Sequence, residues 1–143
     1  MTVELSAIVY SGILLLVLIL ISANANVSAM GMGWGLGNRD NAAAGDGFAG
    51  RAKRAYMNLL EQLVVFSAIA IPAHMADIHS NLTVLAAQLF LAGRVAHAIT
   101  YLFGWTFIAI RTLVWAVALV GTIIFAYAVV TSGALIIAAP AVM

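Results

Sequence analysis

Cysteine is absent from this chain of 143 residues, which excludes a disulfide framework, a thiolate metal site and a cysteine nucleophile. Any thiol that takes part in its chemistry must arrive with a ligand. Charged side chains are also scarce, at 8% of residues, against roughly 25% in an average soluble domain. So few charges could not cover a water-facing surface, which excludes an ordinary soluble protein. The formal net charge of +1 gives no reason to expect a nucleic-acid partner.

The chain consists largely of long apolar runs, and 65% of its residues are hydrophobic. Mean hydropathy is +1.13, and the chain length leaves room for about four membrane spans of about 20 residues each. The runs do not alternate as the strands of a β-barrel would. The expected fold is therefore an all-α integral membrane protein, a single four-helix domain over residues 1–143 in contact with the lipid bilayer. We expect its helices at about residues 5–23, 47–74, 82–103 and 107–134, the last extending towards Pro140.

The longest polar stretch covers residues 24–50 and holds seven of the 12 glycines. Glycine and asparagine at this density indicate irregular backbone, so we predict one extended loop there, with Asp46 capping the next helix. The first apolar run has the length of a helix, and its only charge is Glu4. Because it lacks the basic start of a signal peptide, we interpret it as a retained span. His74 and His79 are interpreted as interfacial or loop residues near the outer surface.

Positive charges lie on one side of the predicted topology. The first and third connections, or residues beside them, carry Arg39, Arg51, Lys53, Arg54 and Arg111. The opposite side carries Glu4 and Asp77 and no lysine or arginine. The positive-inside rule then places the basic loops in the cytoplasm and both termini outside.

Polar residues inside the expected spans form three stripes, and each is costly to place in a membrane. At about 100° per residue, the stripe on the second helix falls within an arc of about 80° and spans about 15 Å. Because successive helices run in opposite directions, all three stripes lie in the cytoplasmic half. The second helix carries Arg51, Arg54, Asn58 and Glu61, the third Arg94, His97 and Tyr101, and the fourth Arg111, Thr112 and Trp115.

The stripes contain four arginines and one glutamate, an excess of about three positive charges. A cationic pocket in a low dielectric favours an anionic ligand, and guanidinium groups suit carboxylates especially. Taken singly, the residues have a simpler explanation, in which Glu61 neutralises an arginine and Asn58 joins two helices. His97 has no second ligand at metal-binding spacing, so we expect no metal site.

Two of these segments resemble a known family. The segment from Arg51 to Glu61 (RAKRAYMNLLE) resembles the signature of the MAPEG family, the membrane-associated proteins of eicosanoid and glutathione metabolism. The segment from Gly93 to Leu102 (GRVAHAITYL) is similar to the third helix of a prostaglandin-forming member. The segment from Gly37 to Asp40 looks more like the short bacterial members, which implies a bacterial inner membrane.

The resemblance implies a homotrimer that holds glutathione, as a co-substrate, in a cleft between subunits. It implies that Arg111 faces the thiol and that Thr112 stands where the prostaglandin-forming member has a serine, which makes these two the candidate catalytic residues. The remaining positions imply glutathione binding: Arg51, Arg54, Asn58 and Glu61 for the carboxylates and amine, with Arg94, His97 and Tyr101 lining the same pocket.

The chain also departs from the eicosanoid-forming members. The first helix has no basic residue near its cytoplasmic end, where Arg39 is the nearest substitute, and Trp115 replaces an aromatic hydroxyl. An eicosanoid substrate is therefore not implied. We expect a glutathione-dependent transferase or peroxidase acting on small lipophilic electrophiles. The alternatives are a non-catalytic trimer that binds glutathione or another small anion, and a structural membrane protein. A small transporter is less favoured because the stripes stop near mid-membrane.

Overall fold

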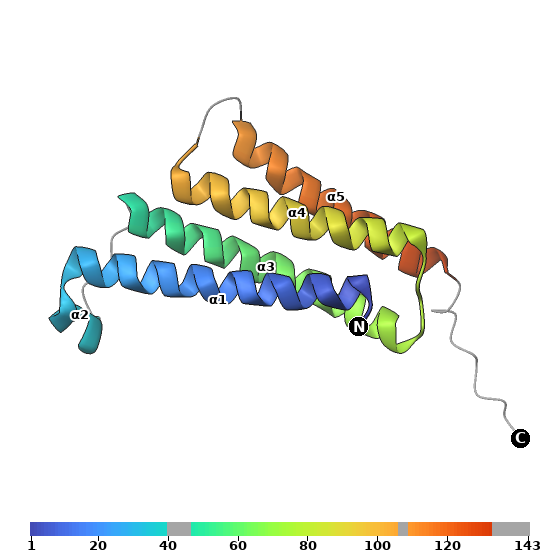
Figure 1. The fold of residues 1–143 in the computed structure, drawn as a ribbon, viewed down its shortest axis with the longest axis horizontal. Helices are drawn as coiled ribbons and strands as arrows, with labels where there is room; N and C mark the ends of the chain where they lie inside the picture. Colours follow the sequence, from blue (N-terminus) through green and yellow to red (C-terminus); the bar gives the residue numbers. More distant parts are fainter. Residues whose placement is uncertain (40–46, 106–108, 133–143) are drawn as a thin grey trace, which may run out of the picture.

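The computed structural model describes residues 1–39, 47–105 and 109–132. Five helices lie in these ranges: α1 (Val3–Met30), α2 (Met32–Leu36), α3 (Gly47–Met75), α4 (Asn81–Phe103) and α5 (Ile110–Thr131). The four long helices are each long and apolar enough to cross a membrane. They pack side by side as one bundle (Figure 1). The prediction of an all-α fold with four candidate membrane spans is confirmed.

The first helix is longer than its sequence suggested. The prediction that irregular backbone begins at Asn24 was wrong, because α1 continues to Met30 and α2 follows directly. Asn24 and Asn26 each donate a side-chain hydrogen bond of 2.8 Å to the backbone carbonyl four residues earlier. Each amide thereby has an N–H donor engaged within the helix, which ends only at Gly31, where φ is 89°. Asp46, predicted to cap the next helix, lies outside the described residues.

The other helix ends follow local sequence signals. Ser80 and Thr83 form a reciprocal capping box at the start of α4, and Gly104 ends that helix in the left-handed conformation, with φ at 69°. Pro72 lies within α3, which continues to Met75. In the described part of the last span, α5 begins at Ile110. The predicted extension towards Pro140 falls outside the described residues.

Three phenylalanines form the centre of the apolar core. The Phe66 ring of α3 stacks on the Phe90 ring of α4 with centroids 4.1 Å apart, and meets the Phe125 ring of α5 edge-on at 5.1 Å. Aromatic pairs in these geometries contribute more than their buried area alone. The core therefore holds together the same three helices that carry the polar stripes.

Helices α4 and α5 approach each other closely through small residues. A Cβ atom added at Gly93 would lie 2.7 Å from the backbone nitrogen of Ala118, and one added at Gly121 would lie 2.7 Å from the backbone nitrogen of Phe90. Small residues allow helix backbones in membranes to come this near. Gly93 directly precedes Arg94 in the sequence. The close contact at Gly93 therefore also sets the orientation of the polar stripe of α4 relative to α5.

We expect Gly93→Val to lower the free energy of unfolding by about 1–3 kcal/mol, because the new side chain would have to displace the α5 backbone. The matched control is Gly12→Val on α1, where an added Cβ would meet no atom within 4 Å. Thermal unfolding in mild detergent measures both variants. Equal losses of stability in the two would contradict the close approach of α4 and α5.

Candidate functional site

A cavity of about 250 Å³ lies where the polar stripes of three helices converge. Helix α3 contributes one lining residue, α4 contributes two and α5 contributes three. The lining residues are Asn58, His97, Tyr101, Arg111, Thr112 and Trp115. Residues separated by more than 50 positions along the chain are thus brought together, as the three stripes predicted.

The guanidinium of Arg111 packs over an aromatic wall of this cavity. Its central carbon lies 5.1 Å from the centroid of the Tyr101 ring, and that ring lies 4.8 Å from the His97 ring. A cation held over the face of an aromatic ring is attracted by the negative charge of the ring face. Arg111 is therefore a positioned cation at the edge of the cavity.

A second cation lies behind Asn58. Arg94 is 1% exposed, and its Nη1 donates a hydrogen bond of 2.8 Å to Oδ1 of Asn58. Its Nε and Nη2 atoms are buried and have no hydrogen-bond partner among the residues that the structure describes. Burying a cation against a single neutral acceptor is costly, since desolvation is not repaid by an opposite charge. The positive charge of Arg94 therefore lacks a negative counterpart among the described residues around it.

The bond to Arg94 also orients the amide of Asn58. Its oxygen is engaged by Arg94 at 2.8 Å, and an amide has two N–H donors besides that acceptor. These donors are available to a ligand, because Asn58 itself lines the cavity. No aspartate or glutamate is among the described residues that line the cavity, while Arg111 lines it and Arg94 lies directly behind. Such a cavity is suited to an anion.

Four predicted site residues do not line this cavity: Arg94, which lies beside Asn58, and three residues of α3. Arg54 and Glu61 are exposed on α3, on the same stripe as Asn58. Arg51 is half-buried and packs against the turn after α4, where a Cβ at Gly104 would lie 3.3 Å from its Nε. Arg51 thus contacts the end of α4 in place of the cavity. Its packing could not be read from the stripe alone, because the spacing along one helix does not locate the neighbouring turn.

Trp115 completes the wall of the cavity on α5, one turn beyond Arg111. Its place on the polar stripe was the sequence signal for this role. Among the residues that the structure describes, no group of three histidine, aspartate or glutamate side chains has the arrangement of a metal site.

Comparison with known proteins gives one match. The family model described as the MAPEG family matches residues 7–131, which include the whole cavity and all four long helices except the first residues of α1. No curated protein and no solved structure matches the chain.

Proposed function

The chain belongs to the MAPEG family, and from this premise we propose that it is a glutathione-dependent membrane transferase or peroxidase acting on small lipophilic electrophiles. Membership supports a glutathione-related or eicosanoid-type membrane function. The observation that carries the finer proposal is the cationic cavity, in which Arg111 and the Asn58–Arg94 pair have no acidic partner among the lining residues described.

Arg111 supplies the chemistry in this proposal. A fixed cation near a thiol lowers the pKa of the thiol and favours the thiolate, which is the nucleophile. The chain has no cysteine, so the thiol is that of glutathione. In the transferase reaction the thiolate sulfur forms a bond to an electrophilic carbon, and the leaving group departs with its electron pair. Thr112, at the same edge, can donate a hydrogen bond to the sulfur.

The remainder of glutathione would lie along α3. The cavity, at about 250 Å³, is smaller than the range of roughly 300–1,000 Å³ that is usual for ligand pockets. Arg54 and Glu61 lie exposed on the α3 stripe that leads away from Asn58. Their opposite charges suit the carboxylates and the amine of a zwitterionic peptide. The cavity therefore receives the thiol, and α3 holds the peptide.

A second copy of the chain would cover this exposed part of α3, which supports a homotrimer with glutathione between subunits. A charged residue such as Glu61, which is exposed on α3, is costly to leave against lipid, and a subunit interface removes that cost. Mass measurement in mild detergent should give three copies per particle. A monomer that retains full glutathione binding would contradict a site between subunits.

We place the cavity on the cytoplasmic side of a bacterial inner membrane. The basic residues around the first and third connections support this orientation through the positive-inside rule. The chain has no cysteine of its own, so cysteines introduced singly at Asn41 and Met143 report sidedness directly. In intact cells an impermeant reagent should label Met143→Cys and spare Asn41→Cys. Labelling of both from outside would contradict the orientation.

The rival function is a non-catalytic trimer that binds glutathione or another small anion. Purified protein incubated with glutathione and an aryl halide distinguishes the two. Formation of the thioether conjugate, saturable in glutathione, supports the transferase. Saturable glutathione binding without any conjugate supports the binding protein.

A further inference from the structure

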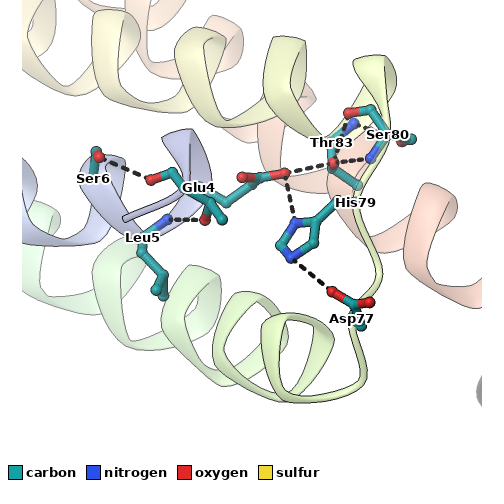
Figure 2. A network of polar contacts seen from close by, with 8 residues as sticks. Glu4, Leu5, Ser6, Asp77, His79, Ser80 and Thr83 are labelled. Atoms are coloured by element: carbon teal, nitrogen blue, oxygen red, sulfur yellow. Dashed lines mark hydrogen bonds and ion pairs between the residues drawn. The ribbon is translucent and has the colours of Figure 1, made fainter.

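A second polar cluster, shown in Figure 2, surrounds the start of α1, at the opposite end of the bundle from the start of α5 (Figure 1), and the proposed chemistry does not use it. At its centre is Glu4, in the first turn of α1, which is 2% exposed. The hydroxyl of Thr83 on α4 donates a hydrogen bond of 2.7 Å to Oε1 of Glu4. A buried carboxylate is costly unless hydrogen-bond donors or a cation compensate for its lost hydration.

His79, in the connection between α3 and α4, lies between two carboxylates. Its Nδ1 is 3.4 Å from Oε1 of Glu4, and its Nε2 is 3.8 Å from Oδ1 of Asp77. Figure 2 shows the imidazole ring with one nitrogen directed at each acid. Asp77 adopts the left-handed conformation, with φ at 56°, which aspartate tolerates better than most residues.

One carboxylate faces each nitrogen of the ring, the buried Glu4 at 3.4 Å and the exposed Asp77 at 3.8 Å. A neutral imidazole has a single N–H, so one of its nitrogens faces a carboxylate with a lone pair. The protonated ring has an N–H on both nitrogens and a positive charge between the two acids. We propose that Glu4, His79 and Asp77 form a proton-linked clasp, which fastens the start of α1 to the α3–α4 connection when His79 is protonated.

The other groups around His79 do not disfavour its protonated form. From α3, the His74 ring lies with its centroid 5.2 Å from that of His79, and it opposes the protonated state only when it is itself charged. From α4, the neighbouring groups are the hydroxyls of Ser80 and Thr83. At the end of α5, the residues that share a cavity with His79 are Ala128, Thr131 and the C-cap Ser132, none of which is ionisable.

The clasp should be tighter in acid than in base, because the protonated ring carries a positive charge between the two acids. The clasp joins α1 to the α3–α4 connection through a contact 75 positions apart in sequence, beside the Thr83 bond to α4, which spans 79 positions. The proposal is independent of glutathione, since none of its residues lines the cavity near Arg111.

The test compares melting temperatures of the full chain in mild detergent at about pH 8 and about pH 5.5, on either side of the usual histidine pKa of about 6.5. The readout is the difference between the two pH values, so that other titrating groups cancel between variants. Relative to His79→Asn, which keeps an N–H near the Nδ1 position but cannot titrate, the wild type should gain on the order of 2–4 °C in acid.

Two further variants make the result specific. Asp77→Asn, at a side chain that is fully exposed, should fold normally and reduce the acid gain. His74→Asn is the matched control and should keep the gain or enlarge it, because it removes the competing histidine. An unchanged acid gain in His79→Asn would overturn the clasp, and so would its loss in His74→Asn.

Discussion

Replacing Arg111 by methionine is expected to slow glutathione conjugation at neutral pH by roughly 10- to 30-fold, because a nearby cation lowers an acid's pKa by about 1–3 units, whereas an unperturbed thiol with a pKa of about 8.5 is only a few per cent thiolate at this pH. Glutathione affinity should stay within a few-fold, since the carboxylates and amine of the peptide are assigned to α3. Steady-state conjugation rates, together with calorimetric titration of glutathione, separate the two effects.

Arg111→Lys is the matched control for this loss. It keeps a positive charge, but a compact ammonium cannot stack on the ring of Tyr101 as the guanidinium does at 5.1 Å. Its rate should fall between those of the wild type and Arg111→Met. If Arg111→Met conjugates at the wild-type rate, or if it loses glutathione binding altogether, the assignment of Arg111 to the thiol is wrong.

Replacing Arg94 by methionine is expected to weaken glutathione binding about tenfold or more, a loss typical of a charge-assisted contact. Arg94 donates a hydrogen bond to Asn58, and in the proposed site it is a positioning residue that orients the Asn58 amide and adds positive charge near the cavity. The melting temperature of the ligand-free protein should stay the same or rise. A buried charge without an opposite partner can be replaced by an apolar side chain at no cost.

Asn58→Leu, in contrast, should destabilise the ligand-free protein. It removes the one hydrogen-bond acceptor that the described residues offer to a guanidinium that is 1% exposed, so we expect a loss of about 1–3 kcal/mol in the free energy of unfolding. The double variant with Arg94→Met should recover most of that loss, because the orphaned charge is then gone. If Arg94→Met destabilises the ligand-free protein as strongly as Asn58→Leu, Arg94 is a structural group and is not held for an anion.

The convergence of the stripes was predictable from sequence for a physical reason. Polar residues are costly inside a membrane, so those at helical spacing stand out against an apolar background. His97 and Tyr101 do meet Arg111, and Arg94 does meet Asn58. The α3 stripe also lies on one continuous helix. The trimer and the roles of the individual residues stay predictions.

Three features could not be predicted from local pattern. The end of α1 was placed too early because Asn24 and Asn26 have low helix propensity, and their bonds to carbonyls one turn back become visible only in the structure. The packing of Arg51 depends on the position of the Gly104 turn. The contact of Glu4 with Thr83 joins residues 79 positions apart, and no periodicity along a single helix indicates such a pair.

The most direct measurement is the ultraviolet absorbance of thiolate when glutathione is added to purified wild-type protein at neutral pH. Free glutathione is mostly a thiol at this pH, since an unperturbed thiol has a pKa of about 8.5. The account predicts a thiolate band that grows in proportion to the bound fraction and is absent when Arg111→Met is titrated in parallel. Tight binding of glutathione to the wild type with no thiolate band would contradict the enzyme and leave the non-catalytic binding protein.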